Sequence, residues 1–576
     1  MDFDRRACGA LALLVLGACA TGERRFALRA PMTLDTDLRP VTVPCRADPT
    51  PKDPKHVTCA PEPYVSPVIW DGADNLLFRP LSEALAFEAT TESVNVNSLD
   101  EVPDSAWFTN RIGAHPMSIE DVQRGACEPA KLLDPDVAPD GSWVIDKGKE
   151  NGSSPGFRVA IAGKGKFMFK SDGAVPEHAS AASVVGAAAY NAVGFYTSCE
   201  QIVYIKRSLL KLTPGLRVTG NFLGGKPFDE KALDAVLAVT ARRGALLRFQ
   251  ASSWLPGRLV GPFRYEGTRD DDPNDVIPHE NRRELRGGAL LAAWVDHFDA
   301  REQNSMDSWV VEKPSEGDSS PGHLVHFYLD TSDCLGSTWD WDEVTRRLGF
   351  SYIVDWGDLS RDFVTLGIPV RPWDRVKRLP GFEQFFYFDV DNFEADKWKN
   401  EYPNPAFSRM TERDGAWMAR ILSRFSPGAV KALAELANFT DHRQTDYLAY
   451  VLEGRLRKIL ERYLTHLSPV ADLHVVDDRL CGVDLAEARA LRDAESFRYT
   501  AHTKANWLPV ARGPGGEVCV ALSHVAADGG APDDAPERYL GVVVDDGVAR
   551  GKLVAYLYDL GPSRGFRLAG VERPEP

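Results

Sequence analysis

The sequence predicts an α+β protein, and three patterns carry that prediction. Hydrophobic residues alternate along residues 157–170 around a glycine-containing turn, which predicts a β-hairpin. Apolar residues recur at helical spacing in residues 279–298 and again in 413–467, which predicts long helices. From about residue 470 short strand-like runs alternate with turns, so we expect a small β-rich C-terminal module at residues 470–576.

Length and composition exclude several classes of protein. The chain has 576 residues, of which 44% are hydrophobic and 26% charged, with a formal net charge of −16. At roughly 100–200 residues per domain this length predicts about three units, each able to bury a core. A disordered or collagen-like chain is therefore excluded. The acidic balance lacks the basic face that nucleic-acid binding needs, so we expect no nucleic-acid partner.

The first residues resemble a bacterial lipoprotein signal. Two arginines precede an apolar run at residues 11–15, and Leu16-Gly17-Ala18 places small residues directly before Cys19. Because the run is too short to span about 30 Å of hydrocarbon, it predicts a cleaved signal. The tetrad resembles the lipobox in which the cysteine becomes lipidated. We expect residues 1–19 to be a signal peptide with its lipobox, and Cys19 to anchor the chain in the bacterial envelope, at the outer membrane or the periplasmic face. The alternative is a buried N-terminal helix.

Residues 20–67 predict a tether that holds the body away from a membrane. Cys45 and Cys59 lie in it and either form a disulfide or remain thiols. The seven cysteines beyond Cys19 are an odd number spread widely, so we expect no disulfide framework, and no spacing indicates zinc. The prolines that exclude helix and central strand here are Pro40, Pro44, Pro49, Pro51, Pro54, Pro61, Pro63 and Pro67.

The middle of the chain predicts a regular succession of elements. Residues 68–154 are expected to form an extension that packs on the main domain through Trp107 and Phe108. The predicted hairpin then ends at Lys170. An alanine-rich helix, a further strand, the long helix, another strand and three more helices follow at residues 178–193, 201–205, 279–298, 324–329, 413–425, 427–438 and 445–467.

The sharpest motif follows the long helix. His297, Asp299 and Asn304 have the form His-x-Asp-x-x-x-x-Asn, the spacing of a protein-kinase catalytic loop. In that chemistry an aspartate orients the attacking hydroxyl, and an asparagine five residues later holds a metal on the phosphates. Arg301 could neutralise charge on the transferred phosphoryl group.

Two further residues extend this motif. Asp330 ends an apolar strand downstream and suits a second Mg²⁺ ligand, while Lys170 ends the predicted hairpin upstream, where a phosphate-binding lysine belongs. The order of lysine strand, helix, strand, helix, catalytic loop, strand and aspartate makes the combination more specific than any single part.

With these residues the sequence resembles the atypical protein-kinase-like superfamily, nearest to its HipA-like branch. The resemblance covers residues 155–345 and implies a two-lobed protein-kinase-like fold, with an N-lobe containing an insertion at 155–278 and a helical C-lobe at 279–469. It implies that Lys170 and Tyr204 bind the nucleotide, that Asp299 and Arg301 are catalytic, and that Asn304 and Asp330 bind the metal. The cofactors would be Mg²⁺ and ATP. The partners would be a nucleotide and an acceptor, either a protein or a small molecule.

The sequence leaves a second hypothesis open. The helix after Lys170 should present a glutamate to it, yet residues 178–193 contain no acid and Glu177 stands only at the start. A catalytically silent kinase fold, acting as an envelope binding or scaffold module, is therefore the alternative to an envelope phosphotransferase. A hydrolase or glycan-processing enzyme with its site in the C-terminal part is a third class, but no clear paired-carboxylate motif supports it. Gly152-Ser153-Ser154-Pro155-Gly156 also lacks the strand-to-helix context of a nucleophile elbow.

Overall fold

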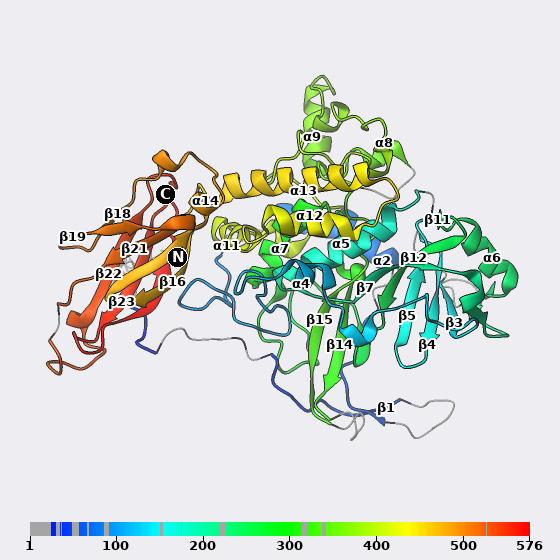
Figure 1. Cartoon of the computed structure of the whole chain (residues 1–576), viewed down its shortest axis with the longest axis horizontal. Helices are drawn as coiled ribbons and strands as arrows, with labels where there is room; N and C mark the ends of the chain where they lie inside the picture. Colours follow the sequence, from blue (N-terminus) through cyan, green and yellow to red (C-terminus); the bar gives the residue numbers. More distant parts are fainter. Residues whose placement is uncertain are drawn as a thin grey trace, which may run out of the picture.

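A computed structural model contains both helices and sheets, so the predicted α+β class is confirmed. Figure 1 shows a sheet at one end, helices above a second sheet in the middle, and β-strands at the other end. The predicted signal peptide, Cys19 and much of the expected tether lie outside the described residues. These are 25–29, 35, 37–48, 57–65, 68–85, 91–149, 154–173, 175–218, 226–313, 320–336, 341–525 and 527–576.

The first sheet begins with an antiparallel meander. Strands β3 (Trp143–Lys149), β4 (Gly156–Ile161) and β5 (Gly165–Lys170) pair in sequence order. The β4–β5 hairpin is the predicted one. Strand β3 was not predicted, because polar residues and a register shift after Ile145 interrupt its alternation.

Later segments complete this sheet. Strand β12 (Leu246–Ser253) pairs with β5 on one side and with β7 (Glu200–Ile205) on the other, and short strands β8 (Leu210–Leu212) and β11 (Arg242–Arg243) lie at its margins. Phe157, Phe169 and Phe249 meet in its core with ring centroids 5.4–6.1 Å apart.

Helix α5 (His178–Val193) connects β5 to this sheet's far edge and is buried along its whole length. It contacts β7 and β12 on one side and helices α4 (Ile119–Arg124) and α12 (Pro427–Leu436) on others. Its alanines follow from this enclosure, since only small side chains fit where elements approach from every direction.

The second sheet follows helix α7 (Arg283–Val295). Strands β14 (Ser305–Val311) and β15 (Gly322–Tyr328) form an antiparallel hairpin, flanked by β13 (Arg258–Gly261) and by β6 (Tyr196–Thr197). Helices α11 (Glu412–Leu422), α12 and α13 (His442–Tyr463) pack above it around buried Trp294 and Trp417. The long predicted helices are therefore confirmed, with ends that differ by a few residues.

The C-terminal residues fold into two packed sheets. One contains β16 (Val470–Val476), β17 (Arg479–Asp484), β21 (Glu517–Ala521) and β20 (Val510–Arg512). The other contains β19 (Trp507–Leu508), β18 (Thr500–His502), β22 (Tyr539–Asp545), β23 (Leu553–Asp559) and β24 (Phe566–Glu572). Apolar side chains from both sheets share one core.

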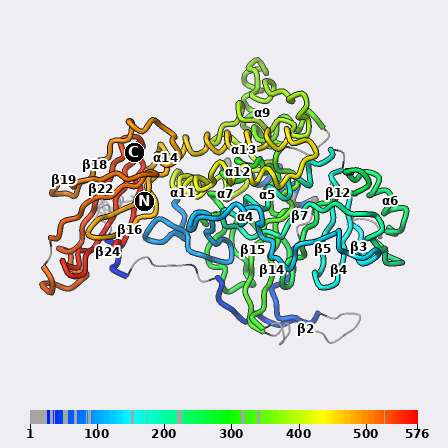
Figure 2. The backbone as a smooth tube through the Cα atoms, in the orientation of Figure 1, coloured from blue at the N-terminus to red at the C-terminus, as the bar shows by residue number. Residues whose placement is uncertain are grey.

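The described parts of residues 25–65 are not a free spacer, which corrects the expectation of a tether there. Phe26 packs among Tyr556, Tyr558 and Ala569 of the C-terminal sheets, and Val41 bridges to Gly322 at the start of β15. Figure 2 shows this blue segment beside the red strands and then below β14 and β15. Prolines exclude helix here, but an extended chain can still bury single apolar residues against sheets.

The expectation of no disulfide framework is also wrong. Cys45–Cys59, Cys127–Cys199 and Cys481–Cys519 form disulfides, and Cys334 is free and buried. The last pair lies directly across the β17–β21 ladder, so only strand pairing, which sequence spacing does not reveal, brings it together.

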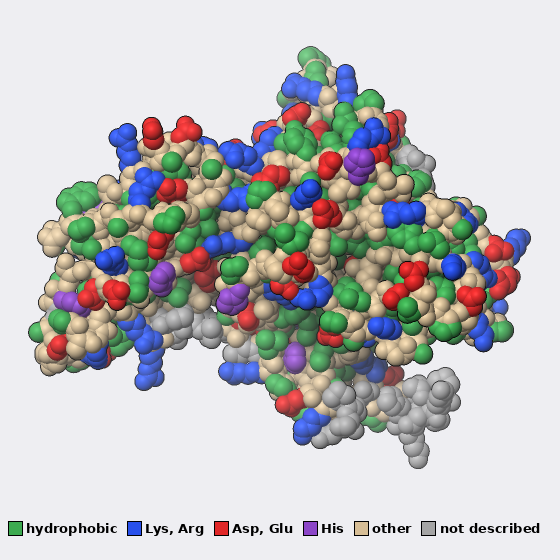
Figure 3. All heavy atoms as spheres, viewed as in Figure 1, with side chains coloured by type: hydrophobic (Ala, Val, Ile, Leu, Met, Phe, Trp, Pro, Cys, Tyr) green, Lys and Arg blue, Asp and Glu red, His purple; other side chains and the backbone are tan. Residues whose placement is uncertain are grey.

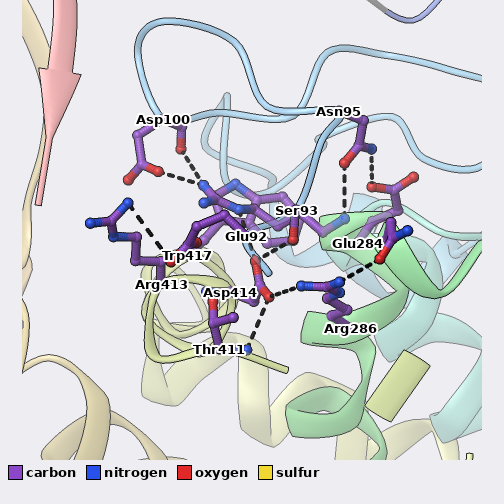
Figure 4. A network of polar contacts seen from close by, with 12 residues as sticks. Glu92, Ser93, Asn95, Asp100, Glu284, Arg286, Thr411, Arg413, Asp414 and Trp417 are labelled. Atoms are coloured by element: carbon purple, nitrogen blue, oxygen red, sulfur yellow. Dashed lines mark hydrogen bonds and ion pairs between the residues drawn. The ribbon is translucent and has the colours of Figure 1, made fainter. Parts of the chain in front are cut away.

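Buried ion pairs connect the extension at residues 91–149 to the helices. Asp414 of α11 accepts a hydrogen bond from Ser93 and pairs with Arg283 and Arg286 of α7 (Figure 4). Asp100 pairs with Arg283, Arg420 and Arg573, the last from the C-terminal residues. As predicted, Trp107 and Phe108 are buried. None of the helices in the described residues is both long and apolar enough to cross a membrane.

Candidate functional site

Lys170 and Asp330 form the centre of the candidate site. The Lys170 Nζ lies 2.7 Å from Asp330 Oδ1, although 160 residues separate them. The Lys170 ammonium and a hydrogen bond from Ser332 hold the pKa of the Asp330 carboxyl well below its usual range, against the effect of burial. Lys170 is nearly enclosed, whereas the Asp330 side chain is 39% exposed, so the pair opens to solvent on the aspartate side.

The β14–β15 hairpin brings the motif residues beside this pair. Ser305 at the start of β14 faces Tyr328 at the end of β15. Immediately beyond, the Leu329 amide donates to the Asn304 carbonyl at 2.9 Å. Asn304 and Asp330 therefore leave the hairpin at the same end, and Asp330 adopts a left-handed backbone with a φ of 47°.

A hydrogen bond and an ion pair within the loop hold residues 299–304 in place. The Asn304 amide nitrogen donates to the Asp299 carbonyl at 2.8 Å, which leaves the amide oxygen as the atom suited to a cation. The Arg301 Nε lies 2.6 Å from Asp299 Oδ1, so the sequence-predicted arginine neutralises the sequence-predicted base.

Glu401 joins this loop and was missed by sequence reasoning. Its backbone amide donates to the Phe298 carbonyl at 2.7 Å, and one of its carboxyl oxygens lies 3.3 Å from an Arg301 nitrogen. Burial and the neighbouring Asp299 raise the pKa of Glu401 to about 9, while burial raises that of Asp299. Glu401 is therefore protonated at neutral pH and can donate to the Asp299 carboxylate. No motif marks it, because it lies 102 residues after Asp299.

Asp333 adds another carboxylate. Its two oxygens are buried and have no hydrogen-bond partner among the described residues. Burial, Asp299 and Asp330 raise the pKa of Asp333 well above its usual range. His297, 3.7 Å away, does not neutralise it, because burial lowers the pKa of that imidazole to about 4.

These residues fit a divalent cation held together with phosphates. Mg²⁺ takes oxygen ligands and is commonly held by one or two carboxylates plus substrate phosphates. Asp330, the Asn304 amide oxygen and the unpartnered Asp333 supply that chemistry. No group of three or more His, Cys, Asp or Glu side chains within the described ranges could hold a metal ion alone. Phosphate oxygens would therefore have to complete the ligand set.

A second lysine reaches the site from β3. Lys149 donates to the Ser154 carbonyl at 2.7 Å, and its pKa is lowered to about 8 by burial and then by Lys170. Its strand neighbour Gly156 lies directly opposite Lys170. Sequence reasoning missed Lys149 because it missed β3.

The glycine turn of the predicted hairpin lies at the opposite end of β5 from Lys170. Gly163 and Gly165 join β4 to β5, whereas Lys170 is the last residue of β5. The β3–β4 connection is the one beside Lys170. There a Cβ on Gly156 would come within 2.2 Å of the Phe169 carbonyl oxygen, so only glycine fits.

Glu177 does not pair with Lys170. Its carboxylate accepts hydrogen bonds from Thr440 at 2.5 and 2.9 Å and lies 3.8 Å from Arg248. Lys170 has Asp330 as its ion-pair partner instead. Glu200 of β7 is a buried carboxyl whose pKa is raised by burial, and Lys170 acts on it in the opposite direction.

Among the described residues, the Tyr204 side chain forms no hydrogen bond with Lys170 or Asp330, so the geometry does not support its predicted nucleotide contact. Its hydroxyl accepts from Arg248 at 2.7 Å and donates to the Asn438 carbonyl at 3.3 Å. The guanidinium of Arg243 lies 4.2 Å from its ring centroid. Tyr204 therefore ties β7 to the loop between α12 and α13.

The other motifs have structural explanations. Ser154 lies between β3 and β4, and Gly156 begins β4, so this is not the strand-to-helix turn of a hydrolase elbow. In the acidic loop at residues 270–275, Asp275 accepts from His279 and Asn274 donates to the carbonyls of Asp37 and Arg39. These residues therefore fasten the loop to its surroundings.

Comparison with known proteins gives one structural neighbour. No protein-family profile matches the chain, and no curated protein matches significantly. The Helicobacter pylori proinflammatory kinase CtkA superimposes with a TM-score of 0.29 and 11% identity, over 55% of this chain and 94% of CtkA. We draw nothing from this overlap about the fold or the activity.

Proposed function

We propose that the chain is a kinase-like phosphotransferase that binds Mg²⁺-ATP between the first sheet and the β14–β15 hairpin. The observation that supports it is the 2.7 Å pair between Lys170 and Asp330, with Asn304 and Asp299 in the adjoining loop. A lysine on the third strand of the N-terminal sheet is where protein kinases place their phosphate-binding lysine, and Lys170 ends the third strand of this meander.

The proposed step uses positioning and charge. As the acceptor oxygen bonds to the γ-phosphorus, the bond from that phosphorus to the β,γ-bridging oxygen breaks, and the acceptor proton passes to Asp299. Mg²⁺, when bound, would neutralise phosphate charge. Lys170 and Lys149 would hold the phosphates, and Arg301 would balance the negative charge of Asp299 before the proton arrives.

Nucleotide binding is the first test. Full-length protein would be heated with Mg²⁺-ATP, since a ligand at 100 times its Kd stabilises the folded state by about 2.7 kcal/mol. We expect a Mg²⁺-dependent rise in Tm that is lost in Asp330→Asn and Lys170→Met and kept in Asp134→Asn, an exposed control. The absence of any rise at millimolar nucleotide in the parent protein would refute the proposed site.

A silent kinase fold is the second candidate, and the position of Glu177 favours it. That carboxylate is held by Thr440, so the helix supplies no partner to Lys170. A nucleotide-dependent rise in Tm without γ-phosphoryl transfer to water or to a hydroxyl acceptor would support this candidate over the enzyme. An ATP-binding protein with measurable transfer would exclude it.

We further propose that the chain is lipid-anchored in the cell envelope through Cys19, on the sequence pattern alone. Mass spectrometry of the protein from a bacterial host should show an acylated N-terminal peptide that begins at Cys19. In Cys19→Ser this acylated peptide should be absent, and a parent protein that also lacks it would refute the anchor.

A further inference from the structure

An unpartnered apolar projection rises from the helical region. Helix α9 (Trp356–Thr365) has no buried residue, and Figure 1 shows it standing above α13 at the top of the molecule. Trp356, Leu359 and Phe363 recur at helical spacing, so they share one face, and all three are exposed. A surface helix normally turns such a face to the core, and this one turns it to solvent.

The turn after the helix extends the apolar surface. Leu366 and Gly367 both have left-handed backbones, with φ of 53° and 70°, and reverse the chain. Leu366 is 85% and Ile368 81% exposed, while Phe363 is 84% exposed. Nothing lies within 4 Å of a Cβ built on Gly367, so the tip stands in open space.

Basic side chains follow this tip in the sequence. Residues 356–378 contain five basic and three acidic side chains, although the whole chain carries a net charge of −16. Arg371 pairs with Asp362, and Arg378 pairs with Asp342. Arg375 and Lys377 are exposed and form no ion pair with any residue that the structure describes. Figure 3 shows green apolar and blue basic side chains together on this projection.

We infer that residues 356–378 are a membrane-docking element that inserts its apolar tip into an anionic lipid surface. Phe363, Leu366 and Ile368 are exposed apolar side chains that would insert, and Arg375 and Lys377 are exposed basic side chains that would contact the headgroups. The excess positive charge is complementary to anionic lipid and opposite to the charge of the chain.

In the sequence, this docking element lies between two residues of the candidate site. It lies between Asp333 and Glu401, and Glu401 reaches back to Phe298 and Arg301. Docking would therefore hold the site near a lipid surface. The inference does not depend on phosphoryl transfer, since it rests on exposure and charge alone.

A local probe tests the inference on the full chain. In a Cys8→Ser and Cys19→Ser background, an environment-sensitive dye would be attached to Leu366→Cys, with Val137→Cys, 77% exposed elsewhere, as the matched control. Cys334 is buried and the other cysteines are paired. We expect phosphatidylglycerol vesicles to shift the emission of the dye at Leu366 to the blue and at least to double its intensity, and to leave the dye at Val137 unchanged.

Charge and apolar contributions are separated by two variants. Arg375→Glu with Lys377→Glu should weaken the vesicle affinity roughly 600-fold, since each basic residue near an anionic surface contributes roughly fivefold and each reversal counts twice. Phe363→Ser with Ile368→Ser should weaken it at least roughly 100-fold. Val137→Ser with Val525→Ser is the apolar control and should bind as the parent does.

Two outcomes would overturn the inference. One is a dye at Leu366 that does not respond to phosphatidylglycerol vesicles, or that responds equally to neutral vesicles. The other is a protein that is dimeric in solution and becomes monomeric in Phe363→Ser with Ile368→Ser, because the apolar face would then be covered by a second copy of the chain.

Discussion

Asp100 is the carboxylate on which the attachment of the C-terminal sheets depends. It lies 2.5 Å from Arg283 and from Arg573 and 3.2 Å from Arg420 (Figure 4 shows Asp100 facing arginine nitrogens). All three arginines are buried. Asp100→Asn keeps the size of the side chain and removes the charge that neutralises them.

The expected loss of stability in Asp100→Asn depends on which carboxylate partners each arginine still has. Arg283 still has Asp414 and Arg420 still has Glu101, but Arg573 has no other carboxylate within ion-pair distance among the described residues. Burial and Arg420 already lower the pKa of Arg573 to about 10. Breaking a buried pair from one side costs about 3–5 kcal/mol, so we expect about 3 kcal/mol here, with the loss concentrated where Arg573 follows β24.

Hydrogen exchange can measure this loss locally. Because a decrease of about 3 kcal/mol in opening free energy corresponds to roughly 100-fold faster exchange, β24 amides should exchange that much faster in Asp100→Asn, while β5 amides stay protected. Asp472→Asn is the matched control, since the Arg424–Asp472 pair at 2.7 Å is largely exposed and should contribute under about 1 kcal/mol. If Asp100→Asn exchanged within fivefold of the parent at β24, the attachment would not depend on this charge.

Three further predictions concern the candidate site. Asp299→Asn should lower phosphoryl transfer at least 100-fold, the contribution typical of a general base, and leave the Mg²⁺-ATP shift in Tm intact; unchanged transfer would exclude Asp299 as the base. ATP binding at pH 8.5 should be accompanied by uptake of a fraction of a proton, because Lys149 has a pKa of about 8 and a bound phosphate favours its charged form. Calorimetry in buffers of different ionisation enthalpy would measure this uptake. Lys149→Met should remove it. Glu401 has a pKa of about 9 in the folded state against an ordinary value of 4.5, so it binds its proton more tightly when folded. Its contribution to the free energy of unfolding therefore falls as the pH rises from about 4.5 to 9. Denaturant titrations should show a flatter dependence of this free energy on pH in Glu401→Gln, and the same dependence as in the parent would contradict the assignment.

The proximity of site residues on the 299–304 loop and the β14–β15 hairpin could be predicted from the sequence, whereas that of residues from distant segments could not. Asp299 and Asn304 lie on one short loop, and Asp330 follows a strand that pairs with the strand after that loop, so local spacing determines their proximity. Glu401 and Lys149 depend on packing of a distant segment and on an irregular strand, and neither leaves a periodic signal.

The same physical distinction explains the errors. The nucleotide contact of Tyr204 was expected only from the family resemblance, and in the structure its hydroxyl bonds to Arg248 and to the carbonyl of Asn438. The disulfides were missed because pairs such as Cys127–Cys199, 72 residues apart, become neighbours only through tertiary packing.

The ion pair of Lys170 bears on the choice between a phosphotransferase and a silent kinase fold. With Glu177 bonded to Thr440, Lys170 neutralises Asp330, the residue that a metal would need. A cation at Asp330 would repel the ammonium, so Lys170 would need another negative group, and nucleotide phosphates supply one. Lys149 interacts electrostatically with Lys170 and Asp330, and Asp333 with Asp299, Asp330 and Glu401. If the proposed site holds a polyphosphate with its cation, the polyphosphate would compensate the lysines and the cation would compensate Asp330, which neither a metal ion nor an anion could do alone.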